Sequence, residues 1–189
     1  MSYKKKLKKK YVWLITGVAG FIGSNTAEFL LKNNQIIVGV DNLKTSSANN
    51  LKNLNKYKNF KFYKFNLEEK FNLKKKIDFC IHLAALNSVP RSFDYPSKVT
   101  KNNILSFINV VLLCKNLKIN KIVYASSSSV YGNSTKKIKQ ENQILKPISP
   151  YAISKVTNEQ HAKIYSNKKM KIRGLRFFNI YGHNQKNDK

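Results

Sequence analysis

Cysteine is scarce in this sequence, with only two among 189 residues. Cys80 and Cys114 lie in apolar stretches and lack the spacing of metal ligands, so we expect buried thiols in a reducing compartment. Long apolar runs are also absent, since no stretch reaches the roughly 18 residues that a spanning helix needs. The N-terminal MSYKKKLKKK has neither the apolar stretch nor the cleavage site of a signal peptide. We therefore expect a cytoplasmic protein.

Acidic residues are also few, because 9 Asp and Glu face 36 Lys and Arg, which gives a net charge of +27. Such an excess can indicate a nucleic-acid or anionic-membrane partner. However, the lysines are dispersed among asparagines and isoleucines, and only Arg91, Arg173 and Arg176 are arginines. We interpret the charge as compositional drift and residues 1–10 as a solvated basic arm. We expect no membrane partner, and weak, salt-dependent DNA binding without sequence specificity.

The length fits one domain, and 42% hydrophobic and 12% aromatic residues argue for a folded core. Apolar, β-branched runs alternate with segments of helical spacing. We predict strands at 11–16, 35–41, 60–65, 77–85, 121–127 and 171–182, and helices at 20–32, 46–54, 97–118 and 149–166. This alternation is typical of the α/β class, and predicts a doubly wound parallel (Rossmann) sheet of six strands over residues 11–189.

The first strand is followed by the glycine-rich segment TGVAGFIG. We expect Gly17 to permit the tight turn, Gly20 to let the backbone approach a pyrophosphate, and Gly23 to bring the helix close to the sheet. The helix N-terminus then favours the phosphates of a dinucleotide. The alternative is a purely structural strand-to-helix turn.

The second strand ends at Asp41, where an acid can accept both hydroxyls of an adenosine ribose. A carboxylate there repels a 2′-phosphate, so NAD is favoured over NADP. The alternative is that Asp41 caps a turn together with Asn42.

The segment SPYAISK, residues 149–155, begins a predicted helix with Ser149 as its cap and Pro150 in its first turn. Tyr151 and Lys155 then lie one turn apart on the same face. A nearby ammonium, helped by the positive nicotinamide ring of an oxidised cofactor, stabilises a phenolate, which makes the tyrosine a general base. The preceding strand ends in ASSSSVYG, which places hydroxyl groups at the carboxyl edge of the sheet.

The segments TGVAGFIG, HLAA, SSSSVYG, YAISK and LRFFNIYG occur in this order between about Tyr11 and Asn184. Because of these segments, the chain resembles the extended short-chain dehydrogenase/reductase family, and within that family the nucleotide-sugar epimerases. The segment HLAALNSVPRS, residues 82–92, is similar to the UDP-N-acetylglucosamine 4-epimerases of bacterial surface-polysaccharide synthesis. The dehydratases of the family carry an acid in the serine segment, and none is present here.

The resemblance implies roles for individual residues. Tyr151 is the base for the sugar 4-hydroxyl while the C4 hydride passes to NAD, Lys155 tunes it and binds the nicotinamide ribose, and Ser127 bonds the same hydroxyl. Cofactor-binding positions, besides the glycines, Asp41, Tyr151 and Lys155, are Phe21, Ile22, Asn42, Asn66, Leu67, Leu83, Ala84, Ala85, Asn103 and Phe177. Positions facing the UDP-sugar are Asn87, Ser88, Ser127, Ser129 and Asn179, with Ser129 toward the N-acetyl group. Family enzymes are often homodimers.

Three departures from the family pattern stand out. Asn66 replaces an aspartate that usually reads the adenine amino group, and Ser106 replaces a glycine of the long helix. The sequence ends at Lys189, where family enzymes continue into a substrate-binding lobe, so we expect that lobe to be missing. Two hypotheses therefore remain: the cofactor-binding part of an NAD-dependent epimerase, or a catalytically silent module that binds NAD or other anions.

Overall fold

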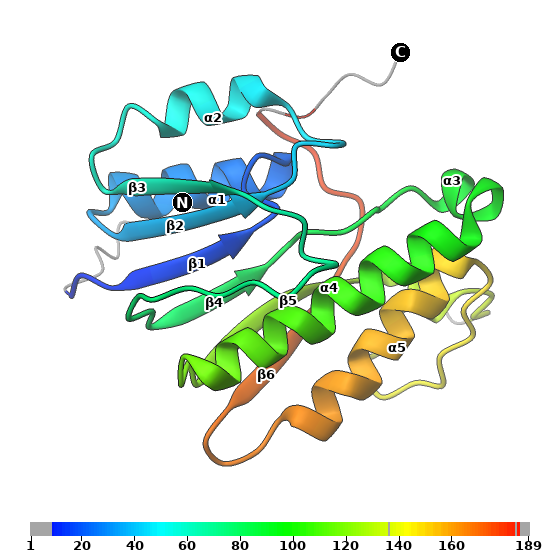
Figure 1. Cartoon of the computed structure of the whole chain (residues 1–189). Helices are drawn as coiled ribbons and strands as arrows, with labels where there is room; N and C mark the ends of the chain where they lie inside the picture. Colours follow the sequence, from blue (N-terminus) through cyan, green and yellow to red (C-terminus); the bar gives the residue numbers. More distant parts are fainter. Residues whose placement is uncertain (1–8, 136, 184, 186–189) are drawn as a thin grey trace.

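The predicted strands form one parallel sheet in the computed structural model of the chain, which describes residues 9–135, 137–183 and 185 (Figure 1). Its strands are β1 (Val12–Thr16), β2 (Ile36–Asp41), β3 (Phe60–Lys64), β4 (Phe79–His82), β5 (Lys121–Ser127) and β6 (Lys171–Phe177). Their order is β3-β2-β1-β4-β5-β6. The six-strand doubly wound sheet is thus confirmed, with a change of direction between β1 and β4, where such sheets bind ligands. Residues 1–8 of the predicted arm lie outside the described part.

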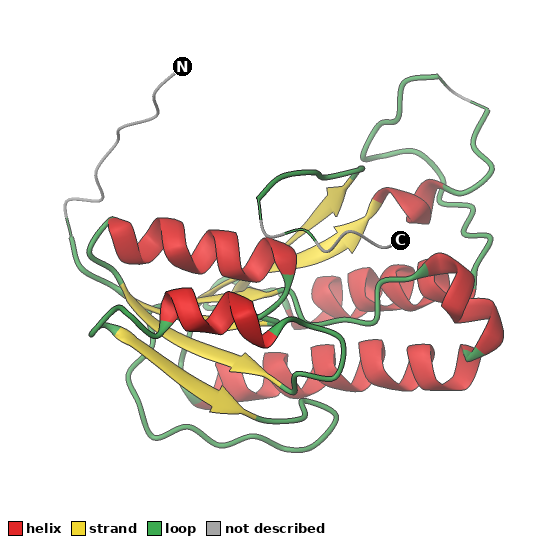
Figure 2. Ribbon diagram, turned by 90° about the horizontal axis from the view of Figure 1, so that it is seen from above, coloured by secondary structure: helices red, strands yellow, loops and turns green. Residues whose placement is uncertain are grey.

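Helices cover both faces of the sheet (Figures 1 and 2). They are α1 (Phe21–Lys32), α2 (Ala48–Leu54), α3 (Val89–Asp94), α4 (Pro96–Asn116) and α5 (Pro150–Tyr165), with a 3-10 helix, η1, at Ser128–Tyr131. α1 and α2 lie on one face, while α4 and α5 lie side by side on the other. Within the described residues, no helix is long and apolar enough to cross a membrane.

The central strands supply side chains to a core on each face. On β1, Leu14 joins the cluster that contains Phe107 of α4, and the next residue, Ile15, joins the cluster that contains Ala27 of α1. All four side chains are buried. Because side chains alternate between the faces of a strand, a strand covered on both sides needs apolar residues throughout. This explains the continuous apolar run of the first strand.

Both cysteines are buried free thiols, as predicted. Cys80 of β4 and Cys114 of α4 form a hydrogen bond in the core, and this bond together with burial raises the pKa of Cys80 well above its ordinary value. The Cys80 thiolate, which is the reactive form, is therefore disfavoured in the folded state.

Three elements differ from the sequence-based prediction. β4 ends at His82 rather than at residue 85, because its partner β1 ends at Thr16, the residue paired with His82. β6 ends at Phe177 rather than at residue 182, because β5 ends there too. α3 is an additional helix that the apolar spacing does not indicate, although Ser88 caps it by accepting a hydrogen bond from a backbone N–H.

Candidate active site

The turn between β1 and α1 is tight and packs on the segment that follows β4. Gly17 has a φ of +69°, a left-handed conformation that glycine adopts without strain. A Cβ atom at Gly17 would lie 2.7 Å from the backbone nitrogen of Ala84. Only glycine therefore satisfies both the backbone conformation and the close approach.

Gly23 and Gly20 keep the start of α1 close to this turn. A Cβ atom at Gly23 would collide with the carbonyl oxygen of Gly17, so the helix packs on the turn itself. Gly20 is the N-cap, with no side-chain hydrogen bond to the helix and no acid in the first turn. No capping side chain thus competes with an anion for the N–H groups of Phe21 and Ile22, which fits a pyrophosphate at this position.

Asp41 ends β2 beside this turn and helps to hold it. Its Oδ2 accepts a hydrogen bond from the backbone N–H of Ala19 (3.0 Å). Its Oδ1 accepts from the backbone N–H of Leu43 (2.9 Å) and from the hydroxyl of Ser46 (2.9 Å). Asp41 thus caps a turn, and the same carboxylate lies beside the glycine turn, where the ribose of a dinucleotide is expected.

The other predicted cofactor residues lie in different environments near the same edge. Asn42 and Asn66 each use Oδ1 to accept a hydrogen bond from a backbone N–H two residues ahead, at 3.0 and 3.4 Å. Leu67 is buried in the core. Asn42 and Asn66 are half-buried, and so are Phe21, Ile22, Leu83, Ala84, Ala85 and Phe177.

Ser127, Tyr151 and Lys155 come together at the carboxyl end of β5. Ser149 caps α5 as predicted, accepting a hydrogen bond from the backbone N–H of Ala152 (3.1 Å). The Ser127 hydroxyl is near enough to the Tyr151 phenol to act on its pKa as a hydrogen-bonding group. The Lys155 ammonium donates to the carbonyl oxygen of Ala125 on β5 (2.9 Å) and lies 5.7 Å from the centre of the Tyr151 ring. The structure thus joins the three residues from two elements.

Burial controls the protonation of this group. It raises the pKa of Tyr151 above its ordinary value, against the opposing effect of the Ser127 hydroxyl. Burial also lowers the pKa of Lys155 to about 8. In the absence of a ligand the phenol form of Tyr151 is therefore favoured, because burial outweighs the opposing effect of Ser127. A positive charge near the ring, such as an oxidised nicotinamide, would favour the phenolate.

We expect Lys155→Met to stabilise the fold at pH 7 by about 2 kcal/mol, because it removes a buried charge. At pH 7 the lysine is protonated in both states, so the burial cost is fully present. Between pH 8 and about 10.5 the folded lysine loses its proton first, so the cost falls and the advantage of the variant shrinks. Urea unfolding at pH 7 and pH 10 measures this, with the exposed Lys163→Met as control. A variant less stable than wild type at pH 7 contradicts it.

Asn103 is buried behind the candidate active site and does not line it. Its Oδ1 accepts from the backbone N–H of Leu86 (2.8 Å), and its Nδ2 donates to the carbonyl oxygen of Leu86 and to the Ser154 hydroxyl (both 3.1 Å). The residue is 1% exposed. Its polar atoms are thus used by the protein, and Asn103 ties the segment after β4 to the helix that carries Tyr151.

His82 is a buried polar residue that the sequence analysis did not single out. Its Nδ1 lies 2.7 Å from the Thr16 hydroxyl, which also accepts a hydrogen bond from the backbone N–H of Leu83 (3.2 Å). Burial and the charge of Lys155 lower the pKa of His82 to about 3. The imidazole therefore stays neutral and fixes the end of β4 against β1.

Glu159 and Arg176 are also missing from the predicted set. Arg176 of β6 donates to both carboxylate oxygens of Glu159 on α5 (2.9 and 2.8 Å), and the Ser126 hydroxyl donates to Glu159 as well (2.5 Å). Burial acts to raise the pKa of Glu159, but the hydrogen bonds from Arg176 and Ser126 outweigh it and lower the pKa. The pair thus fixes α5 against two strands. The helical spacing is the sequence signal that could have identified Glu159, since this residue lies one turn beyond Lys155.

A small cavity lies at the carboxyl end of β5, beside η1. The cavity measures about 220 Å³ and is lined by Val89, Ser128, Ser129, Gly132, Ile148 and Ser149. Of the predicted substrate residues, only Ser129 lines it. Ser88 instead caps α3, with its hydroxyl accepting from the backbone N–H of Arg91 (3.3 Å). Asn87 and Asn179 are exposed.

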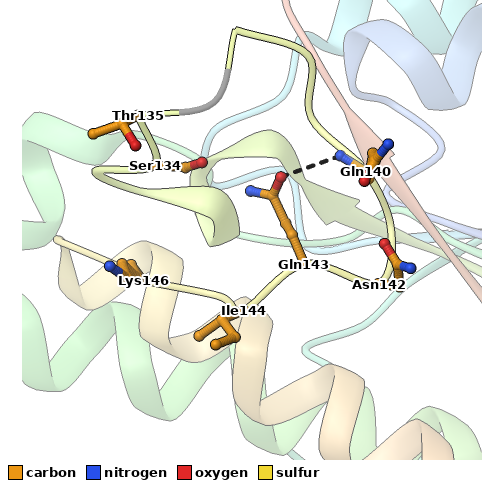
Figure 3. A pocket seen from close by; sticks show the side chains of 7 residues that line it. All are labelled: Ser134, Thr135, Gln140, Asn142, Gln143, Ile144 and Lys146. Atoms are coloured by element: carbon orange, nitrogen blue, oxygen red, sulfur yellow. Dashed lines mark hydrogen bonds between the residues drawn. The ribbon is translucent and has the colours of Figure 1, made fainter.

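A larger cavity of about 420 Å³ lies in the connection between η1 and α5 (Figure 3). Its lining is Ser134, Thr135, Gln140, Asn142, Gln143, Ile144 and Lys146. Gln143 Oε1 accepts a hydrogen bond from the backbone N–H of Gln140 (3.2 Å). None of the predicted site residues lines it, so we place the chemistry at Tyr151 and not in this cavity.

The glycine turn, the acid after β2 and the Ser-Tyr-Lys group define a doubly wound, dinucleotide-dependent class of protein. The chain belongs to the NAD dependent epimerase/dehydratase family, whose family model matches residues 13–189. The resemblance inferred from the sequence is thereby confirmed, and NAD is the cofactor of this family.

Relatives with known names and structures agree with this membership. A putative UDP-glucose 4-epimerase of Methanocaldococcus jannaschii is 36% identical over 91% of this chain and 57% of its own length. A dTDP-D-glucose 4,6-dehydratase of Dictyostelium discoideum is 41% identical over 91% of this chain and 44% of its own length. The structure of a UDP-N-acetylglucosamine 4-epimerase from Methanobrevibacter ruminantium M1 has a TM-score of 0.87 at 32% identity, over 96% of this chain and 59% of that one. The chain thus spans about half the length of the relatives it matches.

Proposed function

We propose that the whole protein catalyses the NAD-dependent 4-epimerisation of UDP-N-acetylglucosamine and UDP-N-acetylgalactosamine, in the synthesis of a surface polysaccharide. The observation that carries this proposal is the joining of Ser127, Tyr151 and Lys155 at the carboxyl edge of the sheet, near the glycine turn. Gly17 packs on Ala84 in the segment after β4, and Asn103 links Leu86 of that segment to Ser154, the residue before Lys155. The dinucleotide end of the site and the proton-transfer end are therefore adjacent.

Each group of the site has a separate role in the proposed reaction. NAD, when bound, would accept a hydride from C4 of the sugar, return it to the opposite face, and bring a positive ring near Tyr151. Tyr151 takes the proton of the sugar 4-hydroxyl and later returns it, with Ser127 bonded to the same hydroxyl. The Lys155 ammonium, held by Ala125, stabilises the phenolate that burial otherwise disfavours.

The acetylated sugar is the finer part of the proposal. It is supported by the SVPRS segment, by Ser129 in the cavity at the carboxyl end of β5, and by the fold shared with a UDP-N-acetylglucosamine 4-epimerase. The test incubates UDP-N-acetylglucosamine and UDP-glucose separately with a form of the protein that includes a substrate lobe, and follows the C4 epimers by NMR. A preference for UDP-glucose would contradict the assignment of an acetylated substrate. NAD binding without epimerisation of either sugar would favour the hypothesis of a catalytically silent module.

A dehydratase is the second candidate, because the D. discoideum relative carries that name. The dehydratases that this sequence resembles have an acid in the serine segment, and the segment from Ser126 to Ser129 has none. The same NMR experiment distinguishes the two activities, since a dehydratase produces a 4-keto-6-deoxy sugar.

We expect the chain to bind NAD more tightly than NADP, because Asp41 opposes a 2′-phosphate. Asp41→Ala should narrow the difference between the affinities for NAD and NADP. It should also weaken the binding of both cofactors, since the carboxylate accepts a hydrogen bond from Ala19 of the glycine turn. Gly20→Val should weaken the binding of both cofactors equally, because its Cβ would lie only 3.2 Å from the carbonyl oxygen of Gly17, in the turn expected to approach the pyrophosphate. Calorimetry with both cofactors measures this. Equal affinity of the unsubstituted chain for NAD and NADP contradicts the assignment of Asp41.

We further propose that the whole protein is cytoplasmic and forms a homodimer, as the resemblance implies. The reduced, buried thiols of Cys80 and Cys114 agree with a reducing compartment. Light scattering on the whole protein measures the oligomeric state, and a monomer at micromolar concentration contradicts the dimer.

A further inference from the structure

Exposed lysines stand at or just before the start of every strand. Because the six strands are parallel, their starts share one edge of the sheet, opposite the edge that carries Tyr151 and the glycine turn (Figure 1). The lysines at the strand starts are Lys10 (β1), Lys32 (β2), Lys58 (β3), Lys76 (β4), Lys121 (β5) and Lys171 (β6). Further exposed lysines in the same connections are Lys9, Lys56, Lys74, Lys75, Lys118, Lys168 and Lys169. We call this set the lysine edge.

Acidic side chains do little to balance the lysine edge. Among the described residues, Asp78 lies there, and its Oδ2 accepts a hydrogen bond from the backbone N–H of Val12 (2.8 Å). Glu28, one turn before the end of α1, pairs with Lys32 (2.7 Å). The opposite edge combines the exposed acids Asp94 and Glu141 with the exposed basic residues Lys44, Lys64, Arg91, Lys98, Lys137 and Lys146. The positive charge is therefore concentrated at the edge away from the candidate active site.

The shape and chemistry of the lysine edge fit a flat anionic surface. Six strands at a spacing of roughly 4.8 Å make an edge about 24 Å wide. Lysines attract phosphate as point charges, without the paired geometry that arginine brings to nucleic acids. Two exposed apolar side chains border the edge: Ile164 (77% exposed) at the end of α5 and Phe29 (57%) at the end of α1. Apolar side chains beside lysines suit the headgroup region of a bilayer.

We propose that the lysine edge binds the surface of a membrane that contains anionic lipids, which leaves the candidate active site facing the solvent. The sequence led us to expect no membrane partner, because its lysines are dispersed along the chain and no segment spans a bilayer. The parallel sheet changes this, since it brings the dispersed lysines to one edge. Each lysine close to an anionic surface strengthens binding about fivefold. The proposal is independent of the epimerase activity.

The test is sedimentation of the 189-residue chain with vesicles of phosphatidylcholine alone, or with about 30% phosphatidylserine added to give the vesicles a negative surface potential. We expect binding to the anionic vesicles only, with a steep loss as salt is raised. The variant Lys74→Gln/Lys75→Gln/Lys76→Gln should bind on the order of 100-fold more weakly. The matched control, Lys44→Gln/Lys98→Gln/Lys137→Gln, removes the same charge from the opposite edge and should bind almost as well as the unsubstituted chain.

Three results would overturn the proposal. Equal losses in the two triple variants would show that total charge, and not the lysine edge, drives binding. Equal binding to both kinds of vesicle would show that anionic lipid is not recognised. Failure to bind anionic vesicles under salt at which the chain retains duplex DNA or RNA would assign the edge to nucleic acid. Circular dichroism of each variant checks that the fold is intact, and Lys168→Gln/Lys169→Gln/Lys171→Gln repeats the test at the other end of the edge.

Discussion

Tyr151→Phe should reduce 4-epimerisation by about 10²–10⁴-fold in a form of the protein that includes a substrate lobe, while NAD and the UDP-sugar still bind. The ring of phenylalanine fills the same buried space beside Lys155, so the packing of α5 is retained. Only the oxygen that exchanges a proton with the sugar 4-hydroxyl is lost. NMR of the C4 epimers measures the rate, and calorimetry measures the two binding steps.

The matched control is Tyr165→Phe, which removes a hydroxyl at the other end of α5, where Tyr165 stacks on His161. It should leave the rate unchanged. Ser127→Ala should also lower the rate, because Ser127 acts to lower the pKa of Tyr151 and would share the substrate hydroxyl. Wild-type epimerisation by Tyr151→Phe would rule out the tyrosine as the base.

Arg176→Ala should destabilise the fold by about 3 kcal/mol, because it leaves the Glu159 carboxylate buried without its partner. The side chain of Arg176 is 18% exposed and that of Glu159 10% exposed, so solvent screens the pair only slightly. Arg176 also donates to the carbonyl oxygen of Glu141 (3.0 Å), which secures the connection between η1 and α5. For a chain of this length the loss lowers Tm by roughly 10 °C, as calorimetry can measure.

Two variants make this prediction specific. Arg173→Ala removes an exposed arginine from the same strand and should change Tm little. Adding Glu159→Gln to Arg176→Ala should recover part of the lost stability, because it removes the unpaired buried charge. If the double variant is less stable than Arg176→Ala alone, the loss comes from packing rather than from charge.

The stability network and the proposed chemistry share one helix. Tyr151, Lys155 and Glu159 follow one another at intervals of one turn along α5, and all three are buried. Lys155 bonds to Ala125, and Glu159 bonds to the next residue, Ser126. The helix is therefore fixed along the end of β5 just before Ser127. This explains how a long, buried lysine can keep a defined position beside the tyrosine.

Local features of the sequence were sufficient for much of the fold. The cap at Ser149, the spacing of Tyr151 and Lys155, and the left-handed turn at Gly17 depend on residues close in sequence, and the structure has each of them. The alternation of strands and helices likewise predicted the doubly wound sheet, because its apolar runs follow from burial on both faces.

Contacts between distant residues were decided by the tertiary structure alone. The bond between Arg176 and Glu159 depends on β6 lying next to β5 under α5, and the end of β4 at His82 depends on where β1 stops. Asn103 has its supporting role because α4 and α5 pack together. The lysine edge exists because parallel strands all begin on one side. Spacing along a chain encodes which residues share a face of an element, whereas the order and register of the strands determine which elements meet.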